Sequence, residues 1–176
     1  MVVKGPYKIR REIEPRWVAE FVSKFFPDET VAYRVPLGPI PRHLIEEHGF
    51  QKAAGIYYPS RPKVDAVVYG DVELILIEAK LDKYFDGICK LVGYRALLDV
   101  TPEMKPHLNK IVRTIFLAPI IPYWLEVVAR KLNVEIVDYC PEWVKKIWEE
   151  RNKYWQPEYV AERERRKEIL RRLGFE

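Results

Sequence analysis

The sequence has few of the residues that build cross-linked or metal-bound frameworks. Its 176 residues include two cysteines, Cys89 and Cys140, too few for a disulfide framework or for the four thiolates of a structural zinc or iron–sulfur site. No apolar run approaches the roughly 20 residues of a membrane span, and the N-terminus lacks a signal-peptide pattern. These absences exclude a cysteine-stapled secreted domain and favour a cytoplasmic address with no membrane contact.

What the chain does contain is typical of a folded protein. Hydrophobic residues make up 48% and charged residues 32%, and the length fits one domain with a terminal extension. The net charge is +4, with small basic excesses in 1–62 and 141–176 and none in 63–140. Basic flanks around an acidic centre would suit a phosphate-backbone substrate, although such small excesses are common on protein surfaces. The abundance of Glu, Lys, Arg and Pro is compatible with a thermophilic source.

The segment KVDAVVYGDVELILIEAK, residues 63–80, carries the strongest chemical signal. Gly70-Asp71 between two alternating apolar runs predicts a hairpin, with antiparallel strands over Lys63–Tyr69 and Val72–Lys80. With a two-residue loop Tyr69 would face Val72, and Asp65 would face Leu76.

That register predicts one sheet face bearing Asp65, Leu76, Glu78 and Lys80. Asp65 and Glu78 would be diagonal neighbours, roughly 7–8 Å apart, and could share one divalent cation. A cation held there could polarise a phosphate and activate water, with the Lys80 ammonium beside it. The alternatives are charges at a sheet edge or a structural ion pair in an interaction protein, although burying Glu and Lys is unfavourable unless they are paired or metal-bound.

Asp65, twelve intervening residues and then Glu78-Ala79-Lys80 is similar to the signature of the PD-(D/E)XK nuclease superfamily, which includes restriction endonucleases, archaeal Holliday-junction resolvases and RecB-like exonucleases. Val64 stands where the family often has Pro. The resemblance implies a core of helix, three-stranded meander, helix and strand. The elements expected from about Glu14 to Pro119 can be assigned in that order. It also implies a Mg²⁺- or Mn²⁺-dependent nuclease acting on nucleic acid, with DNA expected before RNA.

A helix beginning near Glu14-Pro15 should precede the first strand, Thr30–Val35. Glu14 projects onto its apolar face, whereas Glu20 lies about 60° outside that face at 100° per residue. Because a Glu on this helix often completes the metal shell in the family, the resemblance implies Glu14 as a third ligand, with Glu20 as the second candidate. The alternative is that Glu14 only caps the helix.

The helix after the hairpin should run from an Asp82 cap to about Asp99 and places Lys90 and Tyr94 on one face. RecB-like and related members of the family commonly carry a Gln followed by a Tyr at this spacing next to the active site, and the resemblance therefore implies active-site positions for Lys90 and Tyr94. Here Lys90 stands where Gln is expected, and a solvated Lys–Tyr pair is the alternative.

Residues 36–62 contain five prolines and only one short predicted helix, around Arg42–His48. Long insertions of this kind are often functional loops. Arg42, Arg61 and Lys63 are therefore candidate nucleic-acid contacts, together with His43, unless the segment only supports packing.

The remaining pattern completes an α/β fold with a mixed sheet flanked by helices. Residues 1–140 should form the nuclease-like domain, and residues 141–176 a C-terminal helical extension packed on it. The aromatic residues of that extension are expected to pack in the core or in a homodimer rather than to contact nucleic acid. The prediction is a metal-dependent nuclease; the alternative is a catalytically inactive relative that acts in nucleic-acid binding or as a structural or interaction protein.

Overall fold

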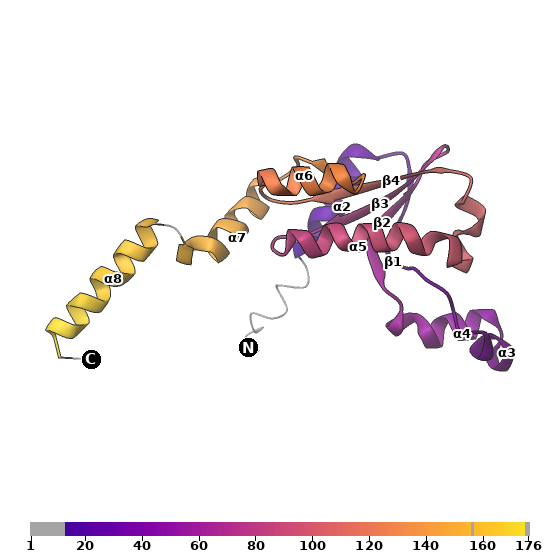
Figure 1. The fold of residues 1–176 in the computed structure, drawn as a ribbon, viewed down its shortest axis with the longest axis horizontal. Coiled ribbons are helices and arrows are strands. Elements are labelled where there is room, and N and C mark those ends of the chain that lie inside the picture. The colour runs from indigo at the N-terminus through magenta and orange to yellow at the C-terminus, as the bar shows by residue number, and fades with distance from the viewer. Residues whose placement is uncertain (1–12, 156, 175–176) are drawn as a thin grey trace. The chain divides into compact units, whose positions relative to one another are not determined.

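The computed structural model describes residues 13–155 and 157–174 (Figure 1). Contacts within the chain divide it into two compact units, Met1–Cys140 and Pro141–Glu176, and each is considered by itself. All the candidate site residues lie in the first unit. No helix in the described part of the chain is long and apolar enough to cross a membrane.

The first unit is built on five strands. These are β1 (Thr30–Pro36), β2 (Lys63–Tyr69), β3 (Glu73–Ala79), β4 (Ile111–Leu117) and β5 (Glu135–Val137). The α-helices are α2 (Ile13–Phe25), α3 (Arg42–His48), α4 (Phe50–Tyr57), α5 (Tyr84–Leu97) and α6 (Tyr123–Lys131), with 3₁₀ turns η1 (Tyr58–Ser60), η2 (Leu98–Val100) and η3 (Pro102–His107).

The strands form one mixed sheet in the order β1-β2-β3-β4-β5. The first three strands are an antiparallel meander, and β3–β4 and β4–β5 pair in parallel. The succession of helix, meander, helix and strand predicted for the core is therefore present, and the α/β fold class is confirmed. The parallel β3–β4 pair requires a crossover, which α5 supplies.

Alternating residues of the central strands supply two apolar faces. Val67 and Leu76 belong to the main core cluster with Ile88 and Leu91 of α5. Because successive side chains of a strand point to opposite faces, the neighbouring residues of β2 and β3 face the other way, toward α2. Figure 1 shows α2 and α5 on the two sides of the strands. The end of β3 is thus enclosed between two helices.

The hairpin register differs from the prediction by two residues. Tyr69 pairs with Leu74, not with Val72, so four residues separate the paired positions. The Val72 carbonyl accepts a hydrogen bond from Ile111 N at 2.9 Å and so begins the pairing with β4 instead of closing a tight turn. A shift of two preserves the side-chain faces, and it brings Asp65 opposite Glu78 rather than diagonal to it.

Two other predicted elements are corrected. The insertion contains a second helix, α4, and Figure 1 shows α3 and α4 as a pair beside the β1 end of the sheet. The helix after the hairpin begins at Tyr84 with Lys83 as N-cap, in a left-handed conformation (φ 57) and without a side-chain cap, so the prediction of an Asp82 cap was wrong.

The second unit is helical. It comprises α7 (Glu142–Asn152), the 3₁₀ turn η4 (Lys153–Trp155) and α8 (Pro157–Arg172). The rings of Tyr154 and Tyr159 meet edge to face, with centroids 5.0 Å apart. Its helices agree with the predicted helical character of residues 141–176.

We expect Gly87→Ala to destabilise the protein by about 1–3 kcal/mol. A Cβ at this position of α5 would lie 2.2 Å from the Phe116 ring and 2.9 Å from Lys80 Cγ. Gly93, in the same helix, has open space around it, so Gly93→Ala should instead stabilise the helix by about 0.5–1 kcal/mol. Urea denaturation of the two variants tests this, and equal effects would contradict the proposed close approach of α5 to β4.

Candidate active site

Asp65 and Glu78 lie on adjacent strands at the end of the β2–β3 pairing. Ala66 pairs with Ile77, and the same register places Asp65 directly opposite Glu78. Opposite residues in antiparallel strands share a face and have Cα atoms roughly 5 Å apart. Asp65 Oδ2 also accepts a hydrogen bond from Ala79 N at 3.0 Å, which holds its carboxylate against β3.

Glu78 is the most deeply buried acid of this group, with 1% of its surface exposed. Its Oε1 lies 2.9 Å from Lys80 Nζ and 3.7 Å from Lys90 Nζ. Its Oε2 is buried and has no hydrogen-bond partner in the described structure. A buried carboxylate oxygen without a partner is unfavourable unless a cation or proton satisfies it.

The ammonium of Lys80 is surrounded by oxygen atoms. It lies 2.9 Å from Glu78 Oε1 and donates to Ala79 O at 2.9 Å and to Glu14 Oε2 at 3.2 Å. An ammonium has three donors, so these three oxygens fix its position. The Lys80 backbone N–H donates to Leu117 O at 3.0 Å and anchors the residue to β4.

Glu14 enters the site from the first turn of α2. Besides accepting from Lys80, it accepts a hydrogen bond from Leu81 N at 3.2 Å through Oε1. Glu20 lies elsewhere and accepts a hydrogen bond from the Tyr139 hydroxyl at 2.8 Å. Of the two first-helix candidates, the structure therefore brings only Glu14 to Lys80.

The mutual proximity of the acids changes their protonation. Burial, and then repulsion from Asp65, raises the pKa of Glu78 to about 7. Burial also raises the pKa of Asp65, against the opposing influence of Lys80 and of the Ala79 N–H. Burial alone would lower the pKa of Lys80, but attraction to Glu78, Asp65 and Glu14 outweighs it and raises that pKa. Below about pH 7 the pair Asp65–Glu78 thus retains a proton.

Asp65 and Glu78 fit a divalent cation by their chemistry. Two adjacent carboxylates that repel each other, one with an unsatisfied buried oxygen, are the hard oxygen donors that Mg²⁺ and Mn²⁺ prefer. Within residues 13–155 and 157–174 no group of three or more His, Cys, Asp or Glu side chains is arranged to hold a metal ion. Glu14 is paired with Lys80 instead, so the three-carboxylate shell of Glu14, Asp65 and Glu78 stays a prediction.

Lys90 and Tyr94 of α5 border the acids. Lys90 lies 3.4 Å from Asp86 Oδ2 as well as 3.7 Å from Glu78. Tyr94 is buried and donates its hydroxyl hydrogen to Lys63 O at 2.8 Å, so the alternative of a solvated Lys–Tyr pair was wrong. Burial, reinforced by Glu78 and Asp65, raises the pKa of Tyr94. Tyr94 therefore remains protonated and ties α5 to the start of β2.

The three candidate nucleic-acid contacts differ in their availability. Arg61 is 3% exposed and forms a bidentate pair with Glu103 at 2.7 and 2.8 Å, so it is not available to a phosphate and that prediction was wrong. Lys63 donates to the carbonyls of Tyr58 and Arg61 at 2.8 and 3.0 Å, which uses two of its three donors. Arg42 is exposed at the start of α3, as is His43 beside it.

Two residues near the site were not found from the sequence. Gly87 lets α5 approach Phe116 and the Lys80 side chain, and no motif marks it. Arg34 stands opposite Asp65 in the β1–β2 register and has a left-handed backbone, φ 54. A left-handed arginine within a strand has no sequence signal, because that conformation is usually left to glycine or asparagine.

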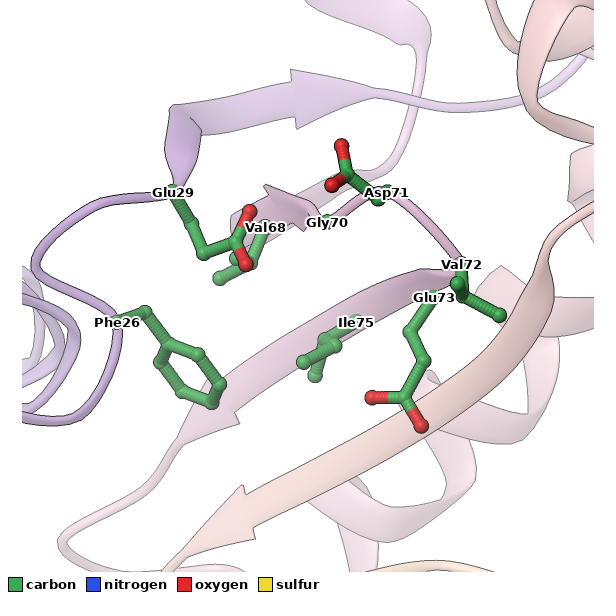
Figure 2. A pocket seen from close by; sticks show the side chains of 8 residues that line it. All are labelled: Phe26, Glu29, Val68, Gly70, Asp71, Val72, Glu73 and Ile75. Carbon is green, nitrogen blue, oxygen red and sulfur yellow. The ribbon is translucent and has the colours of Figure 1, made fainter.

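A cavity of about 260 Å³ lies at the opposite end of the hairpin (Figure 2). Val68 and Ile75 contribute apolar surface, and the carboxylates of Glu29, Asp71 and Glu73 surround them. None of the candidate site residues lines this cavity. Its three acidic groups would repel a phosphate backbone, so the cavity is unsuitable for one.

In metal-free buffer we expect the free energy of unfolding to fall as the pH rises from about 4.5 to 7. An unfolded Glu78 loses its proton near its ordinary pKa of 4.5, whereas the folded one keeps it until about pH 7. The folded state then binds more protons, so the slope of stability against pH is negative over this window. Glu78→Gln should reduce this fall, and the exposed control Glu46→Gln should not. Urea denaturation at several pH values in the presence of a chelator measures it; an unchanged slope in Glu78→Gln would assign the effect to other groups.

Comparison with known proteins gives limited information. No protein-family model matches the chain, and no curated protein does either. Among solved structures, the fold is similar to a repair endonuclease from Pyrococcus abyssi, with 16% sequence identity and a TM-score of 0.43. The match covers 80% of this chain and 50% of that protein, so this chain spans about half of its length.

Proposed function

We propose that this chain hydrolyses phosphodiester bonds in nucleic acid, with DNA expected before RNA, using Mg²⁺ or Mn²⁺. The observation that carries the proposal is the pair of half-buried Asp65 and buried Glu78, with the unsatisfied Glu78 Oε2 and the Lys80 ammonium beside it. A protein core rarely contains such a set unless it binds a cation or performs chemistry.

In this proposal Asp65 and Glu78 hold the cation, whose chemistry is to polarise the phosphate and to acidify a water molecule. Lys80 provides a fixed positive charge that stabilises the additional negative charge of the transition state. Glu14 orients Lys80 through its Oε2 contact and remains the candidate third ligand. Lys90, 3.7 Å from Glu78, adds a second positive charge at the α5 side.

One observation favours a rival function. Lys80 already has three oxygen partners within the protein, which is what a structural ion pair would show. Under this reading the chain binds nucleic acid or another partner without cleaving it. The rival predicts a stability role for Lys80 where the nuclease proposal predicts a catalytic role.

We expect Asp65→Asn and Glu78→Gln to abolish metal-dependent cleavage while the protein stays folded, because each removes charge from a repelling pair. Cleavage of plasmid, single-stranded and branched DNA with Mg²⁺ or Mn²⁺ measures the activity, with Glu46→Gln as the matched control. Wild-type cleavage by either site variant would show that the active site lies elsewhere.

Lys80→Ala should reduce the cleavage rate by about 10²–10³, by analogy with the loss of one oxyanion donor, while binding of metal and nucleic acid persists. The structural reading expects instead a loss of roughly 3–5 kcal/mol of stability, because Glu78 would keep a buried charge without its partner. Thermal melts with and without Mg²⁺ separate the two, with exposed Lys105→Ala as control. A large drop in Tm, with no cleavage by the wild type under either metal, would refute the nuclease proposal.

Glu14→Gln should weaken Mn²⁺ binding by about tenfold or more. This holds whether Glu14 is itself a metal ligand or orients Lys80 beside the ligands Asp65 and Glu78. Glu20→Gln is the matched control on the same helix, since its carboxylate contacts Tyr139. Calorimetric titration of Mn²⁺ into both variants measures the difference. Equal affinities in the two variants would exclude Glu14 from the metal shell.

A further inference from the structure

Three residues on the outer side of the candidate site form a small basic and aromatic surface, which we call the Tyr58 surface. It consists of Arg34 of β1, Tyr58 of η1 and Lys63 of β2. The Tyr58 hydroxyl lies 3.5 Å from Arg34 O, and Lys63 Nζ lies 4.4 Å from the centroid of the Tyr58 ring. The three residues, separated in sequence, are thus brought together by contacts with one tyrosine.

This surface is continuous with the candidate active site through β2. Lys63 precedes Asp65 by two residues, which is about 7 Å along a strand and on the same face. Its carbonyl accepts the Tyr94 hydroxyl at 2.8 Å, so it is also joined to α5. Arg34 stands opposite Asp65 across the β1–β2 pair. A nucleic-acid strand bound at this surface would therefore reach the carboxylates of Asp65 and Glu78.

The backbone of Arg34 is strained where it meets Asp65. Its φ of 54 interrupts β1, yet Tyr33 pairs with Ala66 and Val35 with Val64, so no residue is inserted and the register continues. A left-handed conformation is unfavourable for a residue with a Cβ, and such strain gathers at functional sites. The arginine side chain is exposed and permanently charged.

Tyr58 offers a stacking surface to a ligand. The residue is 40% exposed, and the Lys63 ammonium lies on its ring at cation–π distance. Two donors of that ammonium are used by the carbonyls of Tyr58 and Arg61, which leaves the third for an anion. An exposed ring with the Lys63 ammonium on it, and with the exposed residue Arg34 in contact at its hydroxyl, suits a base joined to its phosphates.

We propose that the Tyr58 surface binds an unpaired nucleotide segment next to the active site and makes the protein selective for single-stranded nucleic acid; this rests on the proposed nuclease function. Tyr58 stacks on one base, and Arg34 and Lys63 contact the adjoining phosphates. A base within a duplex is already stacked on both sides and cannot present its face to an exposed ring. The surface thus distinguishes an unpaired strand, such as an overhang or flap, from a continuous duplex.

The test measures binding without cleavage. Full-length protein is titrated, in the presence of a chelator, into a labelled single-stranded oligodeoxynucleotide and into its blunt duplex of the same length, and fluorescence anisotropy gives both affinities. The wild type should bind the single strand more tightly. Tyr58→Ala should weaken single-strand binding about tenfold or more, whereas Tyr58→Phe, which keeps the ring, should remain close to wild type.

Arg34→Gly removes the guanidinium and allows the left-handed backbone without strain. It should lower single-strand affinity and reduce the slope of log affinity against log salt by about 0.7, the value for one phosphate contact on a single strand. The Tm of Arg34→Gly should stay the same or rise. If Arg34 had only a structural role, a loss of affinity would instead be accompanied by a lower Tm. Tyr123→Ala and Arg130→Ala, exposed positions on α6, are the matched controls and should leave both affinities unchanged.

A wild type that prefers the duplex would overturn the inference, as would equal losses for single strand and duplex in the Tyr58→Ala variant. Full single-strand affinity in both Tyr58→Ala and Arg34→Gly would also overturn it. These outcomes are independent of metal and of cleavage. Failure of the proposed function is seen separately, as absence of cleavage by wild-type protein that binds the single strand normally.

Discussion

The enforced proximity of Asp65 and Glu78 is the constraint on which the rest of the site depends. The β2–β3 pairing places the two carboxylates opposite each other, and the burial of Glu78 prevents water from screening their repulsion. Neighbouring elements supply the compensation: Lys80 from the end of β3, Lys90 from α5, and the Ala79 N–H. Gly87 is part of the same arrangement, because only a residue without a side chain lets α5 approach the Lys80 stem.

The shared face of Asp65 and Glu78 could be predicted from the sequence although the hairpin register could not. Side-chain direction in a strand has a period of two, so an error of two residues changes the opposing partner but not the face. The predicted loop length was wrong because the Val72 carbonyl accepts a hydrogen bond from Ile111 N at the start of β4. That strand lies some forty residues further on, and the local Gly70-Asp71 pattern cannot reveal the contact. The helical phase of Glu14 was informative for the same reason as the strand period: both depend on local backbone geometry.

Features that depend on distant partners were beyond the sequence. Arg61 looked like a phosphate contact, but Glu103, brought close by the fold, takes both arms of its guanidinium. Lys83 and Arg34 adopt left-handed backbones that no residue preference would assign to lysine or arginine. In each case the surrounding tertiary structure overrides the local tendency. A basic residue in a predicted loop is therefore only a weak indication of a nucleic-acid contact until its partners in the fold are known.

The charges of the site also indicate that a proton and the proposed metal ion would compete there. When both acids are ionised, Asp65, Glu78 and Glu14 outnumber Lys80 and Lys90 by one, and Asp86, which pairs with Lys90, adds a further negative charge; a proton on the Asp65–Glu78 pair reduces this excess. Since the pKa of Glu78 is raised to about 7, that proton is held more strongly than by an ordinary glutamic acid and is lost as the pH rises through about 7. A divalent cation requires the same oxygens in their ionised form, so its binding must displace the proton. Burial and the repulsion between the two carboxylates both oppose release of the proton, and the same burial would strengthen the attraction of the ionised pair for a cation.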